Sequence, residues 1–155
     1  MTLSAPVILR YALWIAFVVG AGMVVGMVAN GDMYPWYGTL QKSVLNPPPI
    51  VFPIAWTALY ALMGGAAAWL HGRKERDLLV LFFVQLAVNL AWSFVFFKFH
   101  LIDLSFVWIL ALLAIVAWWV RGIYKMSPKV AMTQLPYIAW LLFASYLSGT
   151  IAFLN

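Results

Sequence analysis

Long apolar stretches alternate with short polar connections along the whole chain. Five stretches contain no Asp, Glu, Lys or Arg, and they run over residues 11–29, 50–70, 78–97, 104–120 and 130–154. Each is about 17–25 residues long, which at about 1.5 Å per residue is enough to cross a hydrocarbon core of about 30 Å. Because lipid offers no partner for a bare peptide group, each stretch is predicted to be a helix.

The pattern therefore predicts an all-α integral membrane protein, a single five-helix bundle over residues 1–155. The helices are expected near residues 8–29, 50–70, 78–97, 104–124 and 130–154, with a long first loop over 30–49. The composition agrees, because 66% of the residues are hydrophobic and 8% are charged, whereas a soluble domain has about 25% charged residues. The absence of cysteine excludes disulfides and thiolate metal sites.

The net charge of +5 is concentrated at the helix ends. This placement is typical of contact with lipid headgroups, so no nucleic-acid partner is expected. Seven basic residues fall on the side of the N-terminus: Arg10, Arg73, Lys74, Arg76, Arg121, Lys125 and Lys129. Only Lys42 and Lys98 fall on the other side. If the protein sits in an inner membrane, the bias predicts a cytoplasmic N-terminus and a C-terminus outside.

Polar side chains recur on one face of the third predicted helix. Gln85, Asn89, Trp92 or Ser93, and Phe96 follow one another at helical spacing. Carboxamides in a membrane helix face protein or a cavity rather than lipid. The stripe is compatible with hydrogen bonds between helices and with a ligand cavity.

Small residues and aromatics leave further alternatives open. Gly22 and Gly26 form a stripe that permits close helix approach, either within the bundle or at a dimer face. Trp36 and Tyr37 in the first loop are either interfacial belt residues or the lid of a pocket. Near the end of the fourth helix, Trp118, Trp119 and Tyr124 are predicted to form an aromatic belt.

The fifth predicted helix contains Pro136, which is expected to kink it. Beyond this point Tyr137, Trp140, Ala144 and Ser148 share one stripe, in which large aromatics alternate with small residues. The space that the small residues leave beside the aromatic rings suits a flat hydrophobic ligand or a neighbouring helix.

Catalytic and metal chemistry have little support in the sequence. The apolar stretches hold no acidic residue, which argues against a carboxylate proton relay. His71 and His100 are predicted on opposite sides of the membrane, so they cannot share a metal. The remaining interior is rich in Trp, Tyr and Phe with a few carboxamides and hydroxyls, a composition that favours binding of a large, flat, apolar molecule.

Four blocks of sequence, in order, resemble one known family. They are Trp36-Tyr37-x-x-Leu40-x-Lys42 followed by Pro47-Pro48; Phe52-Pro53-x-Ala55-Trp56-Thr57-x-Leu59-Tyr60; Gln85-Leu86-x-x-Asn89-x-x-Trp92-Ser93-x-x-Phe96-Phe97; and Pro136-Tyr137-x-x-Trp140-x-x-Phe143-Ala144. With five helices and a long first loop, these blocks resemble the translocator protein or tryptophan-rich sensory protein family (TspO/MBR, peripheral-type benzodiazepine receptors).

The resemblance implies a five-helix bundle, commonly a homodimer, that binds porphyrins such as protoporphyrin IX. Some members bind sterols or synthetic benzodiazepine and isoquinoline ligands. No cofactor is implied beyond a porphyrin as ligand or substrate. By motif match the ligand-binding residues are Tyr37, Trp56, Asn89, Trp92, Trp140 and Ala144. The loop lid is implied to contain Trp36, Leu45 and Pro47, which favours the lid reading of Trp36 and Tyr37.

The chain departs from the family pattern at a few positions. Ser43 and Leu45 stand where the family's loop commonly has Pro and Trp, and Ser148 stands where animal members often have Asn. Gly149 and Phe153 replace the Tyr and Arg of the animal sterol motif, so sterol binding through that motif is not predicted.

Three function classes follow from this reading. The first is a porphyrin-binding translocator or sensor. The second is a light- and oxygen-dependent porphyrin-degrading enzyme, in which Trp56 and Trp140 would take part because no general acid, base or metal is available. The third is a membrane scaffold without a small-molecule ligand.

Overall fold

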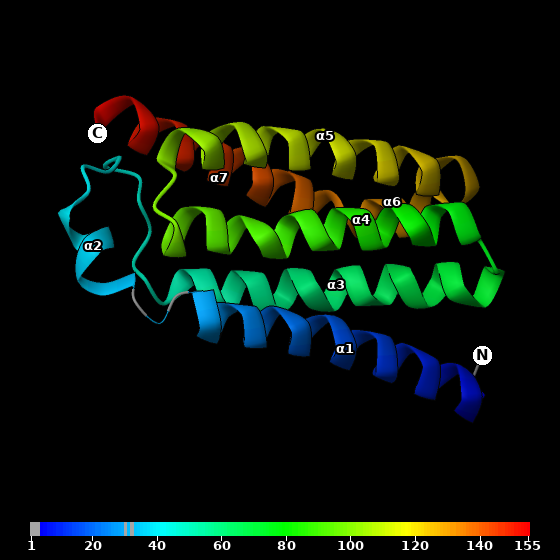
Figure 1. Ribbon diagram of the computed structural model, residues 1–155. Coiled ribbons are helices and arrows are strands. Elements are labelled where there is room, and N and C mark those ends of the chain that lie inside the picture. Colours follow the sequence, from blue (N-terminus) through cyan, green and yellow to red (C-terminus); the bar gives the residue numbers. More distant parts are fainter. Residues whose placement is uncertain (1–3, 30, 32) are drawn as a thin grey trace.

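The chain is an all-α bundle of five membrane spans in the computed structural model, which describes residues 4–29, 31 and 33–155 (Figure 1). The spans are α1 (Ala5–Ala29), α3 (Val51–Arg73), α4 (Arg76–Ser93) continued by the π-helix η1 (Phe94–Lys98), α5 (Ile102–Met126), and the pair α6 (Pro128–Met132) and α7 (Leu135–Leu154). The predicted all-α membrane fold with five spans is confirmed. The homodimer stays a prediction.

The helices extend beyond the apolar stretches into the polar flanks. α3, for example, ends at Arg73, and α5 runs from Ile102 to Met126. Basic side chains such as Arg73 fit the last turn of a helix, where they offset the partial negative charge of the free carbonyls. The predicted loop over 30–49 also contains a short helix, α2 (Met33–Thr39). Residues 1–3 of the predicted domain and residues 30 and 32 of the predicted loop lie outside the described residues.

The two ends of the bundle differ in positive charge. The start of α1, the turn from α3 to α4 and the connection from α5 to α6 lie at one end, which carries the seven basic residues named above (Figure 1). At the other end lie α2, the connection from η1 to α5 and the end of α7. Lys42 and Lys98 belong to that end.

Glycines allow α1 to lie close against α3. A Cβ atom built on Gly64 would lie 2.7 Å from Ile15 Cα and 2.9 Å from the Trp14 carbonyl oxygen. A Cβ on Gly22 would overlap the Tyr60 ring. For Gly22 the stripe therefore serves packing within the bundle.

The fifth span is interrupted rather than kinked at the proline. α6 ends at Met132 and α7 begins at Leu135, so Pro136 falls in the first turn of α7, where its missing N–H is harmless. The buried Gln134 side chain lies in the break and donates from Nε2 to the Leu62 carbonyl oxygen of α3 at 3.0 Å. This contact ties the break to the neighbouring helix and keeps the irregular backbone inside protein.

Aromatic side chains of α5 divide between the core and the outer surface. Trp118 and Tyr124 are exposed, as expected for a belt. Trp119 differs from the prediction, because it is fully buried against Phe82 and its Nε1 donates to the Leu78 carbonyl oxygen at 3.2 Å. Consecutive residues of a helix point about 100° apart, and here Trp118 lies on the outer face while Trp119 points into the bundle.

Candidate functional site

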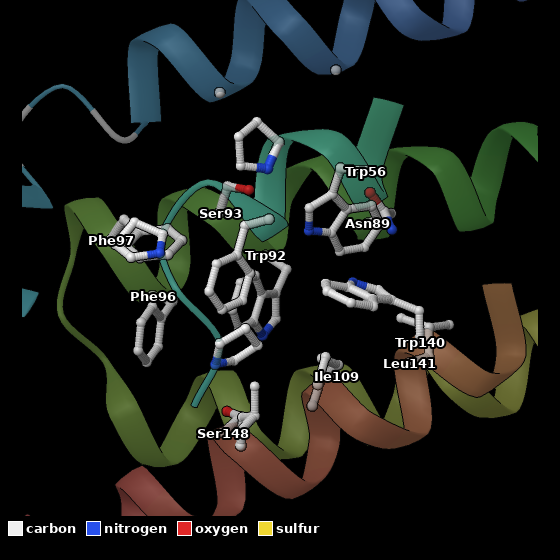
Figure 2. A pocket seen from close by; sticks show the side chains of 18 of the residues that line it. Trp56, Asn89, Trp92, Ser93, Phe96, Phe97, Ile109, Trp140, Leu141 and Ser148 are labelled. Atoms are coloured by element: carbon white, nitrogen blue, oxygen red, sulfur yellow. The ribbon is translucent and has the colours of Figure 1, made fainter. Parts of the chain in front are cut away.

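A cavity of about 510 Å³ lies under the first loop and is bounded by α1, α3, α4 with η1, α5 and α7 (Figure 2). Its volume is within the range of about 300–1,000 Å³ that is usual for small-molecule pockets. None of the lining residues in the described part of the chain is Asp, Glu, Lys, Arg or His. All six residues that the resemblance implied for ligand binding line it: Tyr37, Trp56, Asn89, Trp92, Trp140 and Ala144.

One wall of the cavity consists of aromatic rings from α3 and α7. The indoles of Trp56 and Trp140 meet edge to face, with centroids 6.4 Å apart and planes at 82°. Tyr60 stacks on Trp56 at 5.4 Å, one helical turn away, and Phe52 meets Trp140 edge to face at 6.0 Å. These contacts hold the two indoles at fixed angles.

The facing wall comes from the end of α4 and from η1, and Figure 2 shows Trp92, Phe96 and Phe97 on that side. Trp92 and Phe96 stack with centroids 5.1 Å apart and planes at 6°. Trp92 Nε1 donates to the Ser105 carbonyl oxygen of α5 at 2.9 Å, which fixes the ring. Such π-helical segments frequently occur at functional sites.

A buried hydrogen-bond chain lies beside the cavity. Tyr60 donates to Asn89 Oδ1, and Asn89 Nδ2 donates to the Tyr137 hydroxyl, each at 2.9 Å. Tyr137 in turn donates to Gln85 Oε1 at 2.9 Å. Both carboxamides thus make the hydrogen bonds between helices that the stripe allowed, and Asn89 also faces the cavity. Its main role here is to join α3, α4 and α7.

The three predicted lid residues occupy different positions. Pro47 lines the cavity. Trp36 lies outside the lining, where it stacks on His100 with centroids 3.8 Å apart and meets Phe96 edge to face. Leu45 is 61% exposed and does not line the cavity either. The loop therefore covers the site mainly through Tyr37, Asn46, Pro47 and Pro49.

Polar contacts fasten the loop to the end of α7. The Gln41 peptide and the Asn155 side chain form two reciprocal hydrogen bonds, with Gln41 N donating to Oδ1 at 2.9 Å and Nδ2 donating to the Gln41 oxygen at 3.0 Å. The hydroxyls of Ser43 and Tyr146 are hydrogen-bonded at 2.8 Å. Ser43, where the family commonly has Pro, thus contributes to this attachment.

Several lining residues were not predicted from the sequence. Gly26 and Met27 of α1 face the cavity, as do Ile109 and Leu112 of α5. The glycine stripe was a usable signal for α1, because small residues leave space beside a helix. No comparable signal marks Ile109 or Leu112, since aliphatic residues suit lipid, core and cavity equally.

Comparisons with known proteins identify the relatives of this chain. The model of the TspO/MBR family matches residues 12–154. The tryptophan-rich protein TspO of Chlorobaculum tepidum is 34% identical, over 94% of this chain and 98% of that protein. The tryptophan-rich sensory protein of Cereibacter sphaeroides is 32% identical over 84% and 83%, and the translocator protein of Homo sapiens is 36% identical over 77% and 74%. With five membrane spans and a match over nearly its whole length, the chain belongs to the TspO/MBR family.

Proposed function

We propose that this protein reversibly binds porphyrins such as protoporphyrin IX, and related flat hydrophobic ligands, as a membrane translocator or sensor. The observation that carries this proposal is the uncharged cavity of about 510 Å³ between two aromatic walls. Apolar walls supply affinity for a flat apolar molecule, and aromatic side chains can contact its rings by stacking or edge to face. Benzodiazepine and isoquinoline ligands, which are also aromatic and largely apolar, should compete for the same space.

The carboxylates of a porphyrin are proposed to lie toward the loop. Asn89 is mostly engaged elsewhere, because its oxygen accepts from Tyr60 and one of its two amide N–H groups donates to Tyr137. Lys42 lies in the loop, with its ammonium 4.7 Å from the Tyr37 ring centroid. That ammonium donates to the carbonyl oxygens of Tyr37 and Leu40, which holds the positive charge beside a residue of the cavity.

Trp140→Ala is expected to weaken protoporphyrin IX binding by about tenfold or more, a change of about 1.4 kcal/mol. The substitution removes a ring that forms part of the aromatic wall and contacts Trp56. The measurement is saturable quenching of intrinsic tryptophan fluorescence in detergent.

The matched control is Trp118→Ala, because Trp118 is 74% exposed on the outer surface and lies outside the cavity. An unchanged dissociation constant in Trp140→Ala would remove the pocket assignment. Quenching that rises linearly with porphyrin concentration, and that is the same in the native protein and both variants, would indicate partitioning into the micelle.

Light-dependent porphyrin breakdown is a second candidate, favoured by the two cavity indoles of Trp56 and Trp140, whose centroids lie 6.4 Å apart. The test is illumination of bound protoporphyrin IX in air, followed by absorption spectra. A new absorbing product that requires the protein, and is lost in both Trp56→Phe and Trp140→Phe, is expected for this function. Equal bleaching with and without protein would exclude it.

The proposed orientation places the strongly basic end of the bundle in the cytoplasm, if the host is an inner membrane. Seven of the nine Lys and Arg residues support it. The loop that covers the cavity would then face the opposite side.

A further inference from the structure

Three serine and threonine side chains lie in the second half of α7, and one of them differs from the other two. Ser145 Oγ donates to the Leu141 carbonyl oxygen at 2.7 Å, and Thr150 Oγ1 donates to the Tyr146 carbonyl oxygen at 2.9 Å. Both follow the usual pattern of a helical hydroxyl, which bonds back to the carbonyl four residues earlier. Ser148 Oγ has no hydrogen-bond partner among the described residues, although only 3% of the residue is exposed.

An unpaired buried hydroxyl is costly. Leaving such a group without a partner costs about 1–3 kcal/mol, and most buried polar atoms in proteins are paired. Ser148 lines the cavity, as do the aliphatic residues Ile109 and Ile151, and Figure 2 shows Ser148 on the same side of the cavity as Ile109. A molecule in the cavity is therefore in a position to provide the missing partner.

A second buried polar atom of α7 also lacks a hydrogen-bond partner among the described residues. Trp140 Nε1 is buried in the cavity wall and, within the part of the chain that the structure describes, has no partner. The indole nitrogens of Trp92, Trp108 and Trp119, by contrast, donate to carbonyl oxygens. An indole N–H can only donate, whereas a hydroxyl can donate or accept. A ligand that satisfies both groups must carry an acceptor for the indole, and a second acceptor or a donor for the hydroxyl.

We infer that Ser148 is a specificity-determining residue, whose hydroxyl donates a hydrogen bond to a carbonyl or carboxylate oxygen of the ligand. This inference rests on the proposed function and adds a chemical requirement to it. The ligand class is a flat apolar body with oxygen acceptors at its rim. Ser148 and Trp140 are eight residues apart, about 12 Å along the axis of α7, so one ligand of porphyrin size can meet both.

The test compares two porphyrins that share a macrocycle. Protoporphyrin IX carries carboxylates at its rim, and etioporphyrin carries only alkyl groups there. Ser148→Ala is expected to weaken binding of protoporphyrin IX by about tenfold, because a hydrogen bond to a charged group is lost. Etioporphyrin binding should stay within about twofold. Ser148→Thr, which keeps the hydroxyl, should restore most of the affinity for protoporphyrin IX.

Ser145→Ala is the matched control, because it removes a neighbouring hydroxyl that is already bonded within α7. Equal loss of both porphyrins in Ser148→Ala would mean that the residue only shapes the cavity, and no loss of either would mean that it makes no ligand contact. Either result overturns the inference while leaving the proposed function intact.

Failure of both porphyrins to bind the native protein would instead overturn the porphyrin proposal. The same variants are then titrated with 9-fluorenone and fluorene, two flat molecules of which only the first has a carbonyl oxygen. Weaker binding of fluorenone alone in Ser148→Ala supports the inference. Equal effects on the two molecules, or no binding of either, overturn it.

Discussion

Replacing Gly64 by alanine is expected to lower the melting temperature of the detergent-solubilised protein by about 5 °C or more. The added Cβ would lie 2.7 Å from Ile15 Cα and 2.9 Å from the Trp14 carbonyl oxygen. Both are backbone atoms of α1, so they cannot move aside as a flexible side chain does. α1 and α3 must separate along their contact, and the packing around Gly64 is lost.

Gly65 offers a matched control in the same helix turn. A Cβ at Gly65 would meet no described atom within 4 Å. Gly65→Ala should therefore leave the melting temperature unchanged or raise it slightly, because alanine favours the helix by about 1 kcal/mol over glycine. Equal melting temperatures for the two variants would contradict the close packing of α1 on α3.

Gly26→Phe is expected to reduce protoporphyrin IX affinity by about a hundredfold or more, which is about 2.7 kcal/mol. Gly26 lines the cavity, and a Cβ built on it would meet no atom of the described chain within 4 Å. A phenyl ring therefore has room to enter the cavity and occupy the space proposed for the macrocycle. The fold should be retained, because the new side chain fills a space rather than displacing a neighbour.

The control for this effect is Gly20→Phe on the same helix. Gly20 also has open space around its Cβ position, but it lies outside the cavity lining. Fluorescence titration and melting temperature are measured for both variants. If both lose binding equally while both remain folded, the loss comes from a general change in α1, and the proposed ligand position is wrong.

Much of the fold could be predicted from the sequence because the bilayer imposes one rule on every span. An uncharged run of about 20 residues must form a helix when its peptide groups have no other partner. The helix α2 and the π geometry of η1 were not predicted, because tertiary contacts hold these segments in place. Trp36 of α2 stacks on His100, and Tyr37 meets Phe96 of η1 edge to face.

The candidate site was partly predictable for a different reason. Polar and aromatic residues are conspicuous in an apolar helix, so the stripes through Asn89 and Trp140 pointed toward the interior. Their individual partners could not be predicted. Asn89 has its oxygen and nitrogen engaged by neighbouring tyrosines, whereas Trp140 Nε1 is unpaired within the described chain. The sequence gives residue types and spacing, but the rotation of each helix decides which groups meet.

The contact at the break between α6 and α7 lies outside the cavity lining, at the middle of α3, and it holds a helix that forms part of the cavity wall. Gln134 fixes the start of α7 by its hydrogen bond to the Leu62 carbonyl oxygen. Ser148 lies 14 residues further along, about 21 Å away on the helix axis, so a tilt of about 5° at the break moves it by about 2 Å. A change at Gln134 that tilted α7 would therefore change the width of the cavity at Ser148.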